Sequence, residues 1–156
     1  SPVYPGSKLQ RVWQKMEEFY DKKEVGQLGI SNCYDLDVLK YLFNNAKVKP
    51  SIVQNRFYAQ SDYDKEIRSF CNENHITYES FWSLTANPNI LSHEVLQNLA
   101  LKYEKGVAEI FYRFLNHINI VPLNGTTSLK HMIEDLKIGE FELTREEINS
   151  IYNLLN

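Results

Sequence analysis

Apolar residues recur every three to four positions in several stretches of this chain, a spacing that places them on one face of a helix. The clearest stretch, residues 8–23, predicts an amphipathic helix whose apolar face carries Leu9, Val12, Trp13, Met16, Phe19 and Tyr20. A second predicted helix, residues 36–46, follows Asp35, whose negative charge suits the start of a helix, and Lys49-Pro50 ends it.

Short runs of apolar and β-branched residues alternate with these helices and predict four strands. The spacing of Tyr63, Ile67 and Phe70 predicts a third helix. Thr144 and Glu147, three residues apart, form a capping box that predicts the start of the last helix. Strands separated by helices at these spacings predict βαβ crossovers, and hence an α/β fold with a parallel sheet and four βα units. The predicted strands are residues 25–30, 51–53, 76–81 and 118–121. Residues 93–118 are predicted to form a long helical region, which Gly106 is expected to interrupt.

Composition and charge narrow the class of protein. The chain has 156 residues, of which 43% are hydrophobic, enough for one ordinary buried core. Its net charge of −3 comes from acids and bases spread along the whole length, so no basic patch is present to follow a nucleic acid. No apolar run approaches the roughly 18 residues of a membrane span, and no signal peptide is apparent. We therefore expect a soluble, cytoplasmic protein with no nucleic-acid partner and no membrane partner.

Cysteine and histidine offer little chemistry. Cys33 and Cys71 are too few and too far apart for a disulfide framework, and we expect both to be reduced and buried. The four histidines lack metal-ligand spacing, so we expect no metal site and place each at a helix end or on the surface: His75, His93, His117 and His131. The chain starts at Ser1-Pro2 without an initiator Met, which we interpret as a fragment or a processed form.

Polar and aromatic residues follow the predicted strands, where parallel α/β folds gather their functional atoms. Amides and hydroxyls can bind a carboxamide, an aromatic ring can stack on a flat heterocycle, and a loop leading into a helix can hold a phosphate. Together they could form a nucleotide site, although the same residue types are common in plain turns and helix caps, which composition alone favours. The segments that follow the four strands are Ser31-Asn32, Gln54-Asn55-Arg56, Phe81-Trp82-Ser83 and residues 124–128.

The order of several short motifs is similar to that of the aldo/keto reductase family, and residues 54–58, 81–85 and 131–132 look most like a branch of reductase-like proteins found in fungi and protists. The matching segments are Gly29-Ile30-Ser31-Asn32 at the family's GxSN, residues 49–54 at its Pro-x-x-Asn-Gln strand, residues 80–84 at Ala-Tyr-Ser-Pro-Leu, Val121-Pro122-Leu123-Asn124 at Ile-Pro-Lys-Ser, and residues 141–144 at Phe-x-Leu-Thr/Ser. The resemblance covers nearly the whole chain. It implies one domain over residues 1–156, the C-terminal half of a TIM (β/α)8 barrel.

The resemblance also implies a cofactor, NADP or NAD, and assigns residues to it by position. Ser31, Asn32 and Gln54 would hold the nicotinamide carboxamide, and Phe81 would stack on the ring in place of the usual Tyr. The adenosine phosphate end would meet Leu123, Asn124, Thr126, His131 and Glu134. Leu123 stands where NADPH-preferring members have a Lys, and His131 falls near their Arg, so two phosphate-binding cations are replaced. Asp135 stands in place of an Asn.

The resemblance leaves the catalytic residues unassigned, because the family's Asp, Tyr, Lys and His come from the first four strands, which have no counterpart here. One hypothesis is the cofactor-binding half of an NAD(P)-dependent carbonyl reductase, inactive without the N-terminal half in the same precursor or in a partner chain. The alternative is a non-catalytic half-barrel, a pseudoenzyme that serves as a protein-interaction or oligomerisation module. Since a half-barrel has two open strand edges, we expect a homo-oligomer or a docked partner.

Overall fold

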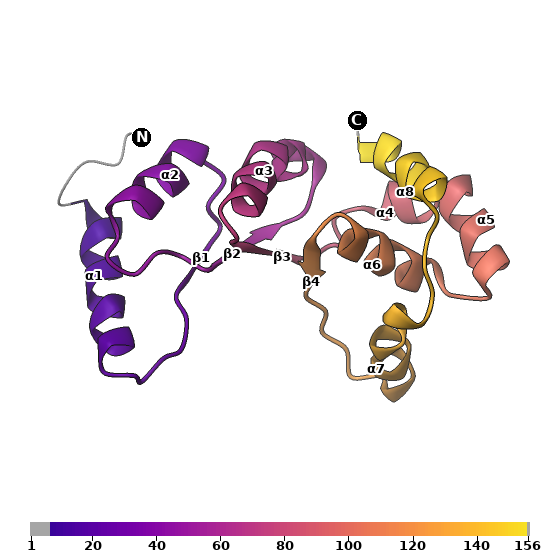
Figure 1. The fold of residues 1–156 in the computed structure, drawn as a ribbon. Helices are drawn as coiled ribbons and strands as arrows, with labels where there is room; N and C mark the ends of the chain where they lie inside the picture. The colour runs from indigo at the N-terminus through magenta and orange to yellow at the C-terminus, as the bar shows by residue number, and fades with distance from the viewer. Residues whose placement is uncertain (1–6, 156) are drawn as a thin grey trace. The chain divides into compact units, whose positions relative to one another are not determined.

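The computed structural model describes residues 7–155, in which strands and helices alternate along the chain (Figure 1). The four strands form one parallel sheet in the order β1-β2-β3-β4 and are β1 (Gly29–Ser31), β2 (Ile52–Arg56), β3 (Thr77–Phe81) and β4 (Ile120–Pro122). The α-helices are α1 (Lys8–Asp21), α2 (Leu36–Asn45), α3 (Lys65–Glu73), α4 (Pro88–Leu91), α5 (Glu94–Tyr103), α6 (Val107–His117), α7 (Leu129–Leu136) and α8 (Arg145–Tyr152). Short 3-10 segments are η1 (Ala59–Asp64), which contains a kink, η2 (Ile138–Glu140) and η3 (Asn153–Leu155). The α/β prediction is confirmed.

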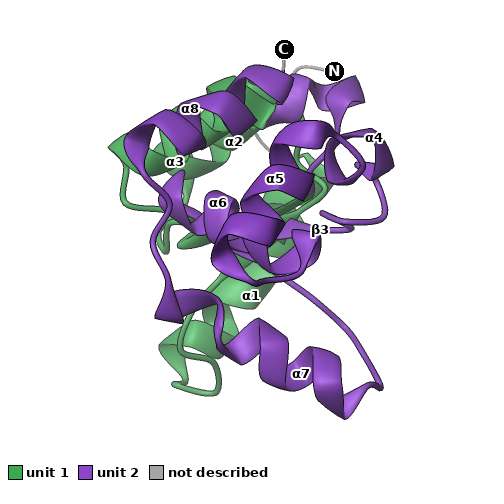
Figure 2. Cartoon of the chain, turned by 90° about the vertical axis from the view of Figure 1, so that its right-hand side faces the viewer, with its two compact units in different colours: residues 1–55, 64–79 green, residues 56–63, 80–156 purple. Residues whose placement is uncertain are grey.

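The chain divides into two compact units, which Figure 2 colours separately. Unit 1 comprises residues 1–55 and 64–79, and unit 2 comprises residues 56–63 and 80–156. Each unit has its own buried apolar side chains. The expectation of one half-barrel domain over residues 1–156 stays a prediction.

In unit 1, the apolar face of α1 packs on the first strand and on α2. Trp13, Leu28 and Leu42 form the buried cluster, against which Met16, Ile30, Ala46 and Val48 also pack. The Trp13 indole Nε1 donates to the carbonyl of Val48 at 2.9 Å, which satisfies the one polar atom of that side chain. The predicted apolar face of α1 is only partly buried: Val12 and Phe19 are each 48% exposed and Tyr20 is 39% exposed. Glu17, which the prediction left out, is buried because its carboxylate accepts from the Val48 amide.

A buried polar network joins β2 to its neighbours in unit 1. Asn55 is fully buried; its side-chain oxygen accepts from the Cys33 amide at 2.8 Å, and its nitrogen donates to the Cys33 carbonyl at 2.7 Å. The same nitrogen donates to Asp64 Oδ2 at 2.7 Å, and the Tyr78 hydroxyl donates to that oxygen at 2.7 Å. Since Cys33 directly follows Asn32, this network holds the backbone just after the Ser31-Asn32 segment.

In unit 2, α6 is the most buried helix. Four of its apolar side chains are essentially inaccessible to solvent: Ile110, Phe111, Phe114 and Leu115. The Phe57 ring lies 6.4 Å from that of Phe111 and is also fully buried. Glu147 joins α8 to α5 by accepting from Lys102 Nζ at 2.6 Å and from the Tyr103 hydroxyl at 2.7 Å.

The predicted interruption of the long helical region is confirmed. Glu104 adopts a left-handed conformation with φ 53° and ends α5, and Gly106 is the N-cap of α6. The Glu109 carboxylate accepts from the Gly106 amide at 2.8 Å. The predicted capping box at Thr144 is also present.

The strand boundaries differ from the predictions. Residues 25–28 precede β1, which begins only at Gly29, and Ile118 and Asn119 complete the turn after α6, so β4 begins at Ile120. Gln54, Asn55 and Arg56 were expected to follow the second strand, but Gln54 and Asn55 lie inside β2 and Arg56 is its last residue. The reason is that pairing with a neighbouring strand, which is not local in sequence, decides where a strand ends.

The predicted placement of the cysteines and histidines is confirmed. Cys33 and Cys71 are free and buried. His93 caps α5, His117 is the last residue of α6, His131 is exposed on α7, and His75 follows α3. Among residues 7–155, no group of three His, Cys, Asp or Glu side chains is arranged to hold a metal ion, and no helix is long and apolar enough to cross a membrane.

Candidate functional site

The pairing of β1 with β2 brings three predicted site residues together in unit 1. Ser31 is paired with Gln54 in the parallel ladder, and the Asn32 amide donates to the Gln54 carbonyl at 3.0 Å. Asn32 has φ 56°, a left-handed conformation that Asn tolerates better than most residues. This turn ends the strand and leaves both Ser31 and Asn32 exposed.

The side chains of this group carry polar atoms toward solvent. Asn32 Nδ2 donates to Ser31 Oγ at 3.3 Å, and the Tyr34 hydroxyl donates to Asn32 Oδ1 at 3.3 Å. Both bonds are long for their type and exposed, so a ligand could replace them at little cost.

Gln54 is oriented by a residue that the sequence gave no reason to select. Its Nε2 donates to Glu79 Oε2, on β3, at 2.9 Å. Since an ionised carboxylate can only accept, the nitrogen of the Gln54 amide must face Glu79 and the oxygen must face away. Gln54 therefore has its carbonyl oxygen available as a fixed acceptor.

In unit 2, the ends of β3 and β4 are joined by the backbone. The Leu123 amide donates to the Ser80 carbonyl at 2.7 Å, and Phe81, the last residue of β3, accepts on its carbonyl from the Phe57 amide at 3.3 Å. Phe81 is half-buried and Leu123 is partly exposed.

Trp82 directly follows Phe81 and is 56% exposed, which is unusual for so large an apolar ring. The Arg56 guanidinium lies over it, 4.4 Å from the ring centroid, and 5.2 Å from the ring of Tyr58. This cation–π contact holds the exposed ring in place beside the end of β3.

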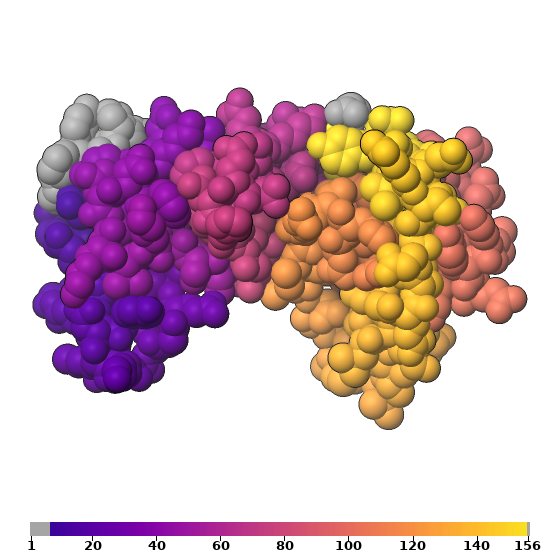
Figure 3. Space-filling view, in the orientation of Figure 1, coloured from indigo at the N-terminus to yellow at the C-terminus, as the bar shows by residue number. Residues whose placement is uncertain are grey.

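A cavity of about 360 Å³ lies beside α7 in unit 2 and is bordered by the loop after β4 and the start of α6. Figure 3 shows α7 in golden orange at the lower end of this unit. Four of the predicted residues, Asn124, Thr126, His131 and Glu134, line the cavity, and Leu123 does not. The other lining residues are Leu84, Gly106, Val107, Ala108, Glu109, Tyr112, Gly125 and Asp135.

Local hydrogen bonds shape the loop and the start of α7. Thr126 Oγ1 accepts from the Ser128 amide at 3.0 Å, and Ser128 Oγ accepts from the His131 amide at 3.4 Å. Asn124 Nδ2 donates to Asp135 Oδ2 at 2.6 Å and ties the loop to the last turn of α7. These bonds explain why a segment rich in Asn, Gly, Thr and Ser is ordered next to a cavity.

Acidic side chains give the cavity a negative charge. Burial raises the pKa of Asp135, His131 opposes the rise, and the neighbouring Glu134 and Glu109 add to it. Burial and the charge of Asp135 also raise the pKa of Tyr112 to about 12. Tyr112 and Glu109 come from α6, and no local sequence pattern marked them as site residues.

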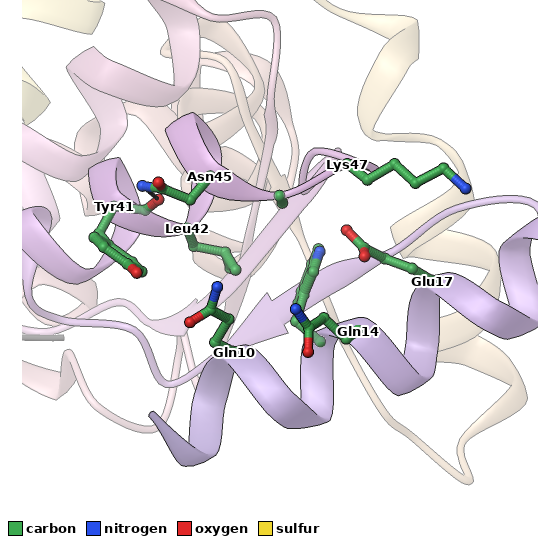
Figure 4. Close-up of a pocket in the computed structure, with 9 residues that line it drawn as sticks. Gln10, Gln14, Glu17, Tyr41, Leu42, Asn45 and Lys47 are labelled. Atoms are coloured by element: carbon green, nitrogen blue, oxygen red, sulfur yellow. Dashed lines mark hydrogen bonds between the residues drawn. The ribbon is translucent and has the colours of Figure 1, made fainter. Parts of the chain in front are cut away.

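A second, smaller hollow lies between α1 and α2 in unit 1 (Figure 4). Gln10 and Glu17 border it from α1, and Tyr41 and Leu42 from α2. Glu17 Oε1 already accepts from the Val48 amide at 3.0 Å, so its polar atom has a structural role. At about 130 Å³ it is smaller than the roughly 300 Å³ of ordinary ligand pockets.

The family model and a curated relative point to the same protein family. The model of the aldo/keto reductase family matches residues 2–156. Glyoxal reductase of Bacillus subtilis is 29% identical over 149 residues, a match that covers 95% of this chain and 53% of that protein.

Solved structures agree with the sequence comparison. An aldo-keto reductase enzyme from a Medee basin deep-sea metagenome library superposes with a TM-score of 0.83 at 25% identity and covers 92% of this chain and 53% of its own. A silkworm (Bombyx mori) aldo-keto reductase complexed with NADPH has a TM-score of 0.79 at 20% identity, over 97% of this chain and 49% of its own. The chain thus spans about half the length of the relatives it matches.

Proposed function

The chain belongs to the aldo/keto reductase family, and on that basis we propose that it is the cofactor-binding half of an NAD(P)-dependent carbonyl reductase. The observation that carries the proposal is that Ser31 and Asn32, at the end of β1, are paired with Gln54 on the neighbouring strand β2. The silkworm relative complexed with NADPH supports a nicotinamide cofactor.

The polar atoms of this group fit a carboxamide. A carboxamide offers two N–H donors and one carbonyl acceptor, and it needs both kinds of partner. The Gln54 oxygen, turned away from Glu79, accepts from the carboxamide nitrogen, while Ser31 and Asn32 supply a hydroxyl and an amide that donate to its oxygen. Phe81 belongs to unit 2, and its stacking on the nicotinamide ring stays a prediction.

The cavity beside α7 suits the adenosine end. Its volume of about 360 Å³ lies inside the usual range of roughly 300 to 1,000 Å³ for ligand pockets. Asn124 and Thr126 line it with an amide and a hydroxyl, and the start of α7 adds backbone donors.

When bound, the nicotinamide would supply the hydride that reduces a carbonyl carbon. The residues of this chain bind and orient the cofactor. In the register of the family motifs, the Asp, Tyr, Lys and His that move the proton have no counterpart among these 156 residues. We therefore propose that turnover requires a complementary half, from the same precursor or from a partner chain.

A second candidate function is a non-catalytic half-barrel that serves as an interaction module. It is favoured by α7, whose apolar side chains at helical spacing are exposed: Leu129 (72%), Met132 (44%), Ile133 (44%) and Leu136 (86%). Such a face is available to pack on a second copy or on another protein. Replacement of the phosphate-binding Lys by Leu123 also favours this candidate over a cofactor site.

Isothermal titration of the purified chain with NADH and NADPH separates the two. The cofactor proposal predicts micromolar binding of at least one nucleotide, and Gln54→Ala should weaken it about tenfold, the worth of one hydrogen bond to a fixed acceptor. Asn45→Ala, an exposed amide on α2, is the matched control and should bind like the wild type. If neither nucleotide binds and light scattering reports an oligomer, the module is the better description.

A further inference from the structure

We propose that the cavity beside α7 selects an adenosine ribose with a free 2′-hydroxyl and rejects one with a 2′-phosphate, so that the chain binds NADH in preference to NADPH. The inference rests on the proposed cofactor function and deepens it. It is carried by the charges that line the cavity.

Three carboxylates line the cavity, Glu109, Glu134 and Asp135, against one histidine, His131. None of the described lining residues is Lys or Arg. A phosphate monoester carries a charge of nearly −2 at neutral pH and gains most from a guanidinium or ammonium partner. This cavity offers it negative charge instead.

The nearest lysines do not reverse that balance. Lys105 Nζ lies 3.5 Å from Glu109, and Lys130 Nζ lies 3.6 Å from Glu134. Each lysine is thus already engaged by one of the carboxylates, and the Lys130 side chain is 80% exposed and well screened by solvent. Pairing lowers the negative charge of the cavity without placing a cation on its wall.

Asp135 is the residue best placed to discriminate. The 2.6 Å bond from Asn124 holds its carboxylate beside the loop after β4. Burial and the nearby Glu134 and Glu109 raise its pKa, so this position already disfavours negative charge before any ligand arrives. A ribose hydroxyl donates to a carboxylate, as in dinucleotide sites specific for NAD, whereas a phosphate has only acceptors and repels it.

One feature acts in the opposite direction and is weaker. The start of α7 contributes only about half a positive charge, which fades within the first turn. The hydroxyls of Thr126 and Ser128 accept bonds from backbone amides of the same segment, so those amides are not free for a phosphate. Leu123, anchored by its amide to Ser80, adds no charge at the end of β4. The carboxylates therefore decide the preference.

The test is isothermal titration of the full chain with NADH, NADPH, ADP-ribose and 2′-phospho-ADP-ribose, a readout of binding alone. We expect NADH to bind at least about tenfold more tightly than NADPH, and the two ADP-riboses to show the same ratio. Asp135→Asn should strengthen NADPH binding about tenfold and change NADH binding less, because the Asn oxygen still accepts from a hydroxyl.

The control is Glu146→Gln, which removes one negative charge from an exposed position on α8 and should leave the NADH to NADPH ratio unchanged. Tighter binding of NADPH by the wild type, or an Asp135→Asn ratio equal to that of Glu146→Gln, would overturn this inference and leave the cofactor function standing. Binding of none of the four ligands would overturn the proposed function itself.

Discussion

Asn55→Ala is the substitution that tests the architecture of unit 1 most directly. The side chain is fully buried and makes three hydrogen bonds, two to the backbone of Cys33 and one to Asp64. Alanine removes all three and leaves the Cys33 amide and carbonyl without these partners away from water. Each lost bond costs about 1 kcal/mol net, and each buried group left unpaired costs about 1 to 3 kcal/mol. We expect the free energy of unfolding of unit 1 to fall by about 3 to 5 kcal/mol.

The two tryptophans allow the units to be followed separately. Trp13 is buried in unit 1 at 3% exposure, whereas Trp82 belongs to unit 2 and is exposed. In a Trp82→Phe background, urea unfolding followed by tryptophan fluorescence reports on the surroundings of Trp13. The midpoint should fall in Asn55→Ala while the slope with urea stays the same, since the surface exposed on unfolding is unchanged.

Two further variants sharpen the test. Tyr78→Phe removes one bond to Asp64 and should cost about 1.5 to 3 kcal/mol, the range for a hydrogen bond to a charged group. Because Asn55 and Tyr78 share Asp64 Oδ2, the double variant should deviate from additivity. Asn45→Ala, whose amide bonds the Tyr41 carbonyl on the surface, should change stability by less than about 0.5 kcal/mol. The reasoning is refuted if Asn55→Ala is no more damaging than Asn45→Ala.

Two predictions concern titration and reactivity. Burial of the carboxylate acts to raise the pKa of Glu147, but hydrogen bonds from Lys102, Tyr103 and the Thr144 amide lower it from 4.5 to about 2. The ionised Glu147 therefore stabilises the fold above pH 4.5, and this contribution is lost as the pH falls toward 2. Acid unfolding followed by circular dichroism should therefore be less steep between these values in Glu147→Gln; an unchanged profile would contradict the assignment. Burial raises the pKa of Cys33 to about 11 and that of Cys71 to about 12, so neither thiol should react with Ellman's reagent at pH 8 until denaturant is added.

Much of the secondary structure could be predicted from local pattern. The helical period of residues 8–23 gave α1 and its buried Trp13, and the pair Thr144 and Glu147 marked the start of α8. Gly106 was correctly expected to divide the long helical region. These features depend on residues within one or two turns of each other, so the sequence contains what is needed to find them.

The ends of the strands were less predictable. Ile118 and Asn119 are an apolar and a polar neighbour that suit a strand as well as a turn. Their backbone amides donate to carbonyls in the last turn of α6, so both residues belong to the turn. Gln54 and Asn55 were expected in a loop, but the ladder with β1 keeps Gln54 in β2. Strand ends depend on partners more than twenty residues away.

The candidate site was also predictable only in part. Ser31, Asn32 and Gln54 were selected from their order along the chain, and the pairing of β1 with β2 brings them together in unit 1, although Gln54 lies inside β2 and not after it. Their roles toward a cofactor stay predictions. Glu79 and Tyr112 were missed, since each is an ordinary residue of its strand or helix until a distant side chain or a cavity gives it a role.

The sequence by itself determined the alternation of strands and helices and, through the order of its motifs, the family, because both depend on the spacing of residues along the chain. Only the tertiary structure decided the orientation of the Gln54 amide and the gathering of Glu109, Glu134 and Asp135 around one cavity. The physical reason is that charge and hydrogen bonding act through space, between side chains that different elements bring to the same place.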